Sequence, residues 1–160
     1  MTATNTGDAN VPTVTFSAPS SIGGHFSPSV ETTFFSIAGG ETQGYCGIGV
    51  DISLAGDIAV GKTYTLVDRG SYDDKTYFLA DDHAFLTFRA GSCDAPPIQK
   101  GFESVADDGA AVTTDSIVGT VVTVSVEDVV VIGLQDAEYS GAGTMVVNGG
   151  ARADCFYTDR

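Results

Sequence analysis

The sequence predicts an all-β fold, a single antiparallel β-sandwich or up-and-down barrel of about 8–10 strands. Val and Thr supply 36 of the 160 residues, whereas Leu, Glu, Lys, Arg, Gln and Met together supply 22. β-branched side chains fit a pleated sheet better than a helix. The 20 glycines suit many tight turns and bulges. No segment repeats its apolar residues with the helical period of about 3.6.

Segments in which apolar and polar residues alternate predict the individual strands. The clearest is 45–54, where Cys46, Ile48, Val50, Ile52 and Leu54 share one face. Clusters of Asp, Gly and Ser separate most strands. The ten predicted strands are 13–17, 31–38, 45–54, 62–67, 76–80, 84–89, 117–126, 129–134, 143–147 and 152–157. The longest predicted loop, residues 91–114, is long enough to contain a short strand or helical turn near Phe102.

The length indicates one domain, which we expect at residues 11–160 after a polar N-terminal tail at residues 1–10. The tail has neither the basic nor the apolar region of a signal peptide. No segment approaches the ~18 uncharged apolar residues that a membrane-spanning helix needs. With 21 acidic and 7 basic residues, the chain carries a formal charge of −14. Such a charge repels phosphate, so nucleic acid is not an expected partner.

One valine-rich region departs from clean alternation. Residues 129–132 are apolar on both faces, and residues 121–124 nearly so. The favoured interpretation is a central strand that is covered on both sides. The alternative is an interface with a second copy of the chain. Its candidate residues are Val121, Val129, Val131 and Ile132.

Three cysteines, Cys46, Cys93 and Cys155, allow at most one intramolecular disulfide. A Cys93–Cys155 bond would pin the C-terminus and close a loop of about 60 residues. A Cys46–Cys155 bond is an open alternative, because connectivity is not readable from sequence. Three reduced thiols in a cytosolic protein are the third possibility. High Thr, Ser and Gly content, few lysines and an acidic surface favour an extracytoplasmic location, whether secreted, periplasmic or on the cell surface.

Several segments resemble a family of small extracytoplasmic bacterial domains, often lipoproteins, with calycin-like or lipocalin-like β-barrels. Residues 61–66 (GKTYTL) are similar to their "pGtYtL" strand. Residues 119–126 and 133–137 are similar to their "sGtvtvt-V…vsGtFda" ending, and residues 153–156 to their closing strand. The resemblance covers residues 45–67 and 115–157. The chain lacks an N-terminal lipobox cysteine, and Leu134 stands where an aromatic residue is more usual. The resemblance implies a surface or periplasmic β-domain and supplies no catalytic residues.

Residues suited to catalysis or metal binding are few. His83 follows Asp81 and Asp82 in a predicted turn, where it can ligate a metal or orient a base. Such a turn more often simply faces solvent. No Gly-x-Ser-x-Gly elbow is present. The acidic pairs Asp73–Asp74 and Asp81–Asp82 are candidate ligands of a structural Ca²⁺, because hard cations prefer oxygen ligands. No other cofactor is predicted.

The sequence therefore favours a non-enzymatic extracytoplasmic β-domain that assembles with itself or with another surface protein. The alternative is a lipocalin-like carrier of a small ligand, or a carbohydrate-binding domain. A third hypothesis is a hydrolase that uses paired carboxylates or a metal held by His83.

Overall fold

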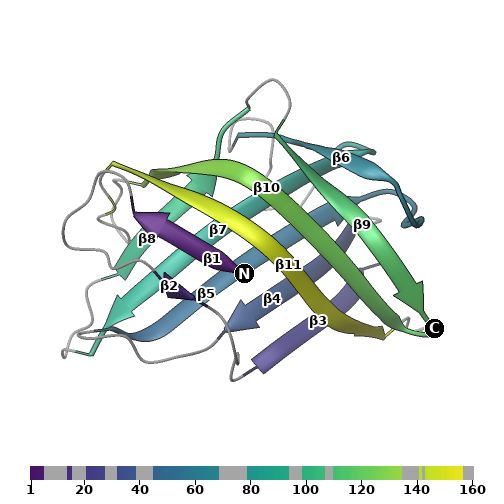
Figure 1. Cartoon of the computed structure of the whole chain (residues 1–160), viewed down its shortest axis with the longest axis horizontal. Coiled ribbons are helices and arrows are strands. Elements are labelled where there is room, and N and C mark those ends of the chain that lie inside the picture. Colours follow the sequence, from purple (N-terminus) through teal and green to yellow (C-terminus); the bar gives the residue numbers. More distant parts are fainter. Residues whose placement is uncertain are drawn as a thin grey trace.

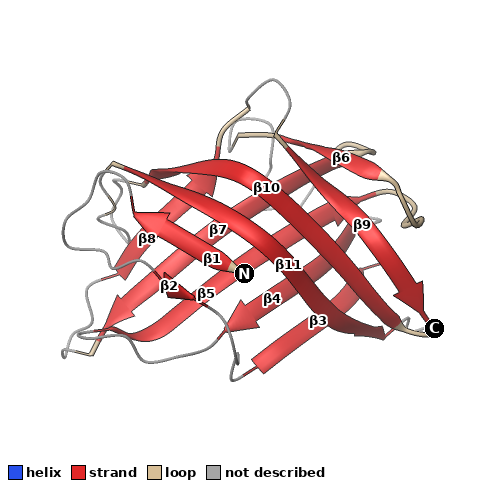
Figure 2. Ribbon diagram, in the orientation of Figure 1, coloured by secondary structure: helices blue, strands red, loops and turns tan. Residues whose placement is uncertain are grey.

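The computed structural model confirms the all-β class. It describes residues 1–5, 14–15, 21–27, 32–38, 45–68, 79–93, 99–106, 110–134, 141 and 143–156. All regular secondary structure in these residues is strand (Figure 2). The strands are β1 (Thr2–Asn5), β2 (Val14–Thr15), β3 (Ser21–Ser27), β4 (Thr32–Ala38), β5 (Tyr45–Ala55), β6 (Thr63–Leu66), β7 (His83–Ser92), β8 (Gln99–Ser104), β9 (Ala111–Val118), β10 (Val121–Gly133) and β11 (Thr144–Phe156).

All of these strands belong to one mostly antiparallel sheet with the order β2-β1-β11-β3-β4-β5-β7-β6-β9-β10-β8. Two further pairings, β11 with β10 and β7 with β8, turn the sheet back on itself. Strands β9, β10, β11 and β1 therefore run across β3, β4, β5 and β7 (Figure 1). The parallel contact of β11 with β3 comprises only two residue pairs. The sheet is thus partly ring-like, in place of the sandwich or closed barrel that the sequence predicts.

Different strands fill the two ends of the space between β7 and β10. At one end β6 pairs with the start of β7, and β9 pairs with both β6 and β10. At the other end β8 alone pairs with both β7 and β10. This wall of the ring is therefore two strands wide at one end and one strand wide at the other.

A buried serine links the strands where β6 gives way to β8 along β7. The Ser104 hydroxyl donates a hydrogen bond to the carbonyl oxygen of Val67 over 2.7 Å. It also accepts one from the backbone N–H of Leu86 over 3.1 Å. Both backbone groups would otherwise lack a partner at the junction, which is costly in a buried position.

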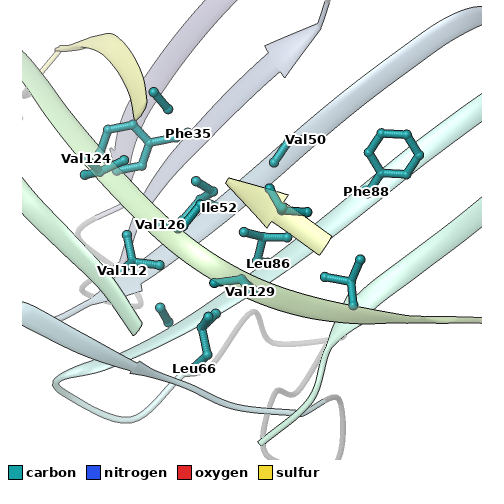
Figure 3. Close-up of a cluster of buried hydrophobic side chains, with 14 of the residues drawn as sticks. Phe35, Val50, Ile52, Leu66, Leu86, Phe88, Val112, Val124, Val126 and Val129 are labelled. Atoms are coloured by element: carbon teal, nitrogen blue, oxygen red, sulfur yellow. The ribbon is translucent and has the colours of Figure 1, made fainter. Parts of the chain in front are cut away.

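The inner face of the curled sheet is filled by one apolar core (Figure 3). The alternation predicted for residues 45–54 is confirmed over residues 48–54, because Ile48, Val50, Ile52 and Leu54 are all buried. The rings of Phe88 and Phe102 pack edge to face with centroids 5.9 Å apart. The largest fully buried side chains are Tyr64, Phe35, Phe88, Phe102, Ile52, Leu54, Leu66, Leu86, Met145, Val50 and Val112.

Strand β10 contains a β-bulge that changes which residues face the core. It pairs with β11 along most of its length, with a register shift between Val126 and Val129. Asp128 adopts a left-handed backbone conformation with φ of 48°. Asn148 on β11 holds this conformation: its side-chain oxygen accepts from the Asp128 N–H over 2.7 Å, and its amide donates to the Asp128 carboxylate over 3.0 Å. As a result Val126 and Val129 are both buried.

The N-terminal residues are part of the sheet. Residues 2–5, which the sequence assigns to a polar tail, form β1 and pair with residues 145–148 of β11. Ala3 is fully buried in the core. Gly149 has φ of +105°, and a Cβ there would lie 3.0 Å from the Cα of Met1. A glycine at this position therefore lets the start of the chain approach β11 closely.

Other predicted elements are merged, split or outside the described residues. The predicted strand 117–126 comprises the end of β9, a turn at residues 119–120 and the first part of β10. The two strands form an antiparallel hairpin. The predicted strands 143–147 and 152–157 are one strand, β11. Strand β8 lies in the predicted long loop, around Phe102. Most of the predicted strand 76–80 lies outside the described residues. No described helix is long and apolar enough to cross a membrane.

Candidate functional site

The outer edge of β9 has no described partner beyond Thr114. Up to Thr114, this edge is paired: residues 111–113 pair with β6, and Thr114 exchanges backbone hydrogen bonds with Gly61 and Lys62 at 2.7 and 2.9 Å. Beyond Thr114, no described strand pairs with β9 on that side. The unpaired stretch, residues 115–118, therefore presents backbone donors and acceptors to whatever lies beside it.

Large apolar side chains are exposed at the end of this stretch. Val118 is 72% exposed and Ile117 is 37% exposed, although Ile117 pairs with the buried Val122. A tight turn at Gly119, with φ of 62°, leads directly into β10. We call residues 115–120 the hairpin edge. Val60 is 62% exposed as well, but it lies in a loop and in no strand.

The valines predicted to form an interface lie in different environments. Val129 and Val131 are fully buried in the core, so these two side chains are not available for the alternative, an interface with a second copy. The bulge in β10 explains the difference, because it turns both side chains inward. Val121 is half-buried, and Ile132 is 41% exposed at the opposite end of β10. In β9 and β10, the exposed large apolar side chains are therefore those at the hairpin edge and Ile132.

A polar cluster connects the two turns beside β6. Lys62 forms an ion pair with Asp82 at 2.6 Å and donates a hydrogen bond to the carbonyl oxygen of Asp57 at 2.7 Å. The hydroxyl of the buried Tyr64 donates to the same oxygen at 2.9 Å, and the Lys62 ammonium lies 5.0 Å from the ring centroid. The hydrogen bond to Asp82 raises the pKa of Lys62 above its usual value, and partial burial opposes this shift. The cluster holds the turns together.

His83 and the acidic pairs do not form a metal site in the described part of the chain. The His83 Nδ1 atom lies 2.8 Å from the carbonyl oxygen of Asp81 and 3.2 Å from that of Ala80. Asp82 is held by Lys62. Asp73 and Asp74 lie outside the described residues. Among the described residues, no group of three or more His, Cys, Asp or Glu is placed to hold a metal ion.

A shallow groove of about 470 Å³ crosses β9, β10 and β11 next to the bulge. Two of its polar side chains already have partners, since Ser125 donates to Asp115 at 2.8 Å and Asn148 holds Asp128. Glu127 is exposed. The lining residues are Ala111, Thr113, Ser125, Val126, Glu127, Asn148 and Gly149. The groove is open and polar, and none of its described lining residues is aromatic.

Of the three cysteines, only Cys93 has a described side chain, so no disulfide between two described side chains is found. Cys93 lies at the exposed end of the β7 region. The two pairings predicted for Cys155, with Cys93 or with Cys46, involve side chains that lie outside the described part of the structure.

No known protein family, curated protein or solved structure matches this chain. The resemblance to calycin-like domains therefore remains an expectation, and the geometry of this chain alone carries the functional argument.

Sequence reasoning missed the hairpin edge because it assigned residues 117–126 to one continuous strand. A signal was present in the Gly119–Thr120 pair, which interrupts a β-branched run. Glycine adopts the left-handed conformation that a two-residue hairpin turn requires.

The ion pair of Lys62 predicts a loss of stability at alkaline pH. The folded state raises the pKa of Lys62. The contribution of the ion pair to the free energy of unfolding is therefore complete below about pH 10.4, the usual lysine pKa, and disappears as pH rises through the higher pKa of the folded state. The Asp82 side chain is 67% exposed, so we expect a contribution below about 1 kcal/mol. Urea unfolding from pH 8 upward measures it.

The variants Lys62→Met and Asp82→Asn both remove the ion pair. We expect the wild type to be more stable than either variant at pH 8 and the difference to shrink at higher pH. A constant difference across this range would contradict the assignment.

Proposed function

We propose that this chain is a non-enzymatic extracytoplasmic structural domain that assembles with further copies of itself through the hairpin edge. The observation that carries the proposal is the strand edge at residues 115–118, which has no described partner and bears exposed Ile117 and Val118. Exposed apolar edge strands are uncommon in monomeric proteins, because they template pairing with another chain. Another surface protein that offers a strand is the alternative partner.

A second copy suits this edge for geometric reasons. Two identical strand edges that meet antiparallel about a two-fold axis each offer the same donors and acceptors, so the contact is self-complementary. Burying the exposed surface of Val118 against a partner adds about 1–2 kcal/mol of apolar transfer free energy per copy. The backbone hydrogen bonds fix the relative orientation of the two strands, and burial of the apolar side chains supplies much of the affinity.

The net charge sets the conditions for this assembly. Each copy carries a formal charge of −14, so two copies repel one another at low ionic strength. At about 0.15 M salt the screening length is about 8 Å, which weakens this repulsion without weakening apolar burial. Assembly should therefore strengthen as salt is raised.

The extracytoplasmic location is supported by the low lysine content, the acidic charge and the resemblance of residues 61–66 to secreted bacterial domains. Self-assembly at the hairpin edge does not depend on the compartment.

A second candidate function is the binding of a small, neutral, hydroxyl-rich ligand in the groove beside the bulge. Its support is the polar lining, which includes Thr113 on β9 and Glu127 on β10. The inner face of the sheet is occupied by the apolar core, which favours this outer groove over a lipocalin-like interior.

The self-assembly proposal predicts that Val118→Lys weakens association. A lysine at this strand edge places a charge where the partner strand would pack. We therefore expect the dissociation constant to rise at least tenfold. Analytical ultracentrifugation at 0.15 M salt over a range of protein concentrations measures it.

Val60→Lys is the matched control, since it makes the same charge change at a similarly exposed valine outside any strand. It should leave association unchanged. A wild type that stays monomeric at all concentrations, or a control variant that weakens association equally, would overturn the proposal.

The groove proposal predicts that a soluble neutral disaccharide shifts the backbone amide signals of Thr113, Ser125 and Asn148 in a ¹H–¹⁵N NMR titration. Thr113→Val keeps the shape of the side chain but removes its hydroxyl, so we expect severalfold weaker binding. Absence of shifts at millimolar ligand, or shifts confined to other residues, would exclude carbohydrate binding here.

A further inference from the structure

Cys46 and Cys93 lie at the same end of two neighbouring strands. In the antiparallel pair of β5 and β7, Tyr45 is paired with Ser92 and Gly47 with Gly91, with a register shift between these pairs. Cys46 is the extra residue in this irregularity, and Cys93 directly follows Ser92. The two backbones are therefore about one strand spacing apart, roughly 5 Å, and the irregularity places Cys46 opposite the Gly91–Ser92 step, about one and a half residues along the strands from Cys93. The two Cα atoms then lie roughly 7 Å apart, at the upper limit of the separations that a disulfide spans.

Cys155 lies far from both of these residues in the sheet. It pairs with β3, which is separated from β5 by β4 and from β7 by β4 and β5. The register continues from Cys155 through Gly24, Phe35 and Ile52 to Leu86. Leu86 precedes Cys93 by seven residues, which is about 23 Å along β7. A disulfide cannot span such a separation.

Cys93 itself is in the bonded form. It is disulfide-bonded, and its partner is not among the described side chains. With three cysteines in the chain, the partner within one molecule is Cys46 or Cys155. The strand register excludes Cys155.

We propose that Cys46 and Cys93 form an intramolecular disulfide that joins β5 to β7, and that Cys155 remains a free thiol. A low-molecular-weight disulfide such as oxidised glutathione is the oxidant. One cysteine thiolate attacks the S–S bond of the oxidant, releases one thiol and forms a mixed disulfide. The second cysteine thiolate displaces the other thiol, so two electrons and two protons end on the reduced oxidant.

The bond has a mechanical role in the sheet. Strand β5 pairs with β7 along most of its length, and this ladder forms one wall of the core. Its register is irregular at Tyr45–Gly47, which weakens the pairing at that end. A covalent link there holds the end of the ladder closed and removes conformational freedom from the unfolded chain. The proposal is independent of self-assembly at the hairpin edge.

Peptide mapping tests the connectivity directly. Trypsin cleavage after Lys and Arg leaves the three cysteines in separate peptides: Cys46 in 1–62, Cys93 in 90–100 and Cys155 in 153–160. Protein that has been incubated with oxidised glutathione is alkylated, digested without reductant and analysed by mass spectrometry. We expect peptide 1–62 linked to 90–100, and alkylated or glutathionylated Cys155. A link that contains 153–160, or three unlinked cysteines, would overturn the proposal.

Thermal unfolding of the intact chain provides the second measurement. Cys46→Ser and Cys93→Ser should each lower the Tm of the oxidised protein by about 10 °C, and the double variant should lower it no further. Cys155→Ser is the matched control and should retain both the bond and the Tm. A reductant should lower the Tm of the wild type but not of the first two variants. Equal effects of all three single substitutions would contradict the assignment.

Discussion

The bulge in β10 is the feature on which the rest of the sheet depends. One edge of this strand pairs with β11, and the other is shared by β9 and β8. A strand of 13 residues has to twist and bend to serve all three neighbours. The extra residue at Glu127–Asp128 supplies that bend, and Asn148 holds it through two hydrogen bonds. The same bulge borders the groove and turns Val129 toward the core.

The bulge also explains which parts of the fold the sequence could predict. Strict alternation identifies β5, because its apolar side chains form one regular face toward the core. In β10, one extra residue moves the inner side chains from even to odd positions, so Val126 and Val129 are both inside. An interpretation that assumes strict alternation divides such a strand into two and places the valines on both faces of the sheet. The missed strands β1 and β3 are polar or glycine-containing, and pairing with β11 and β4 gives them their structure.

The candidate sites were less accessible to sequence reasoning than the core. Val118 is exposed because β6 pairs with residues 111–113 of β9 and does not extend alongside Val118. The lengths of the strands decide this exposure, and the residue types in β9 do not reveal it. Cys46 and Cys93 are 47 positions apart in the sequence, so their proximity depends on the order of the strands in the sheet. The turn predicted to contain Asp81, Asp82 and His83 is confirmed at Asp81 and Asp82, whereas His83 begins β7. The ion pair of Asp82 with Lys62 requires the parallel contact of β6 with β7, which no local pattern indicates.

The most direct test of this account compares Val129→Ala with Val130→Ala in urea-induced unfolding. With the bulge in place, Val129 is fully buried and Val130 is only half-buried on the outer face. We predict that Val129→Ala lowers the free energy of unfolding by about 2 kcal/mol. Val130→Ala should lower it by less than about 1 kcal/mol. If Val130→Ala were the more damaging change, β10 would continue without a bulge, and the arrangement of the core, groove and hairpin edge derived from it would be wrong.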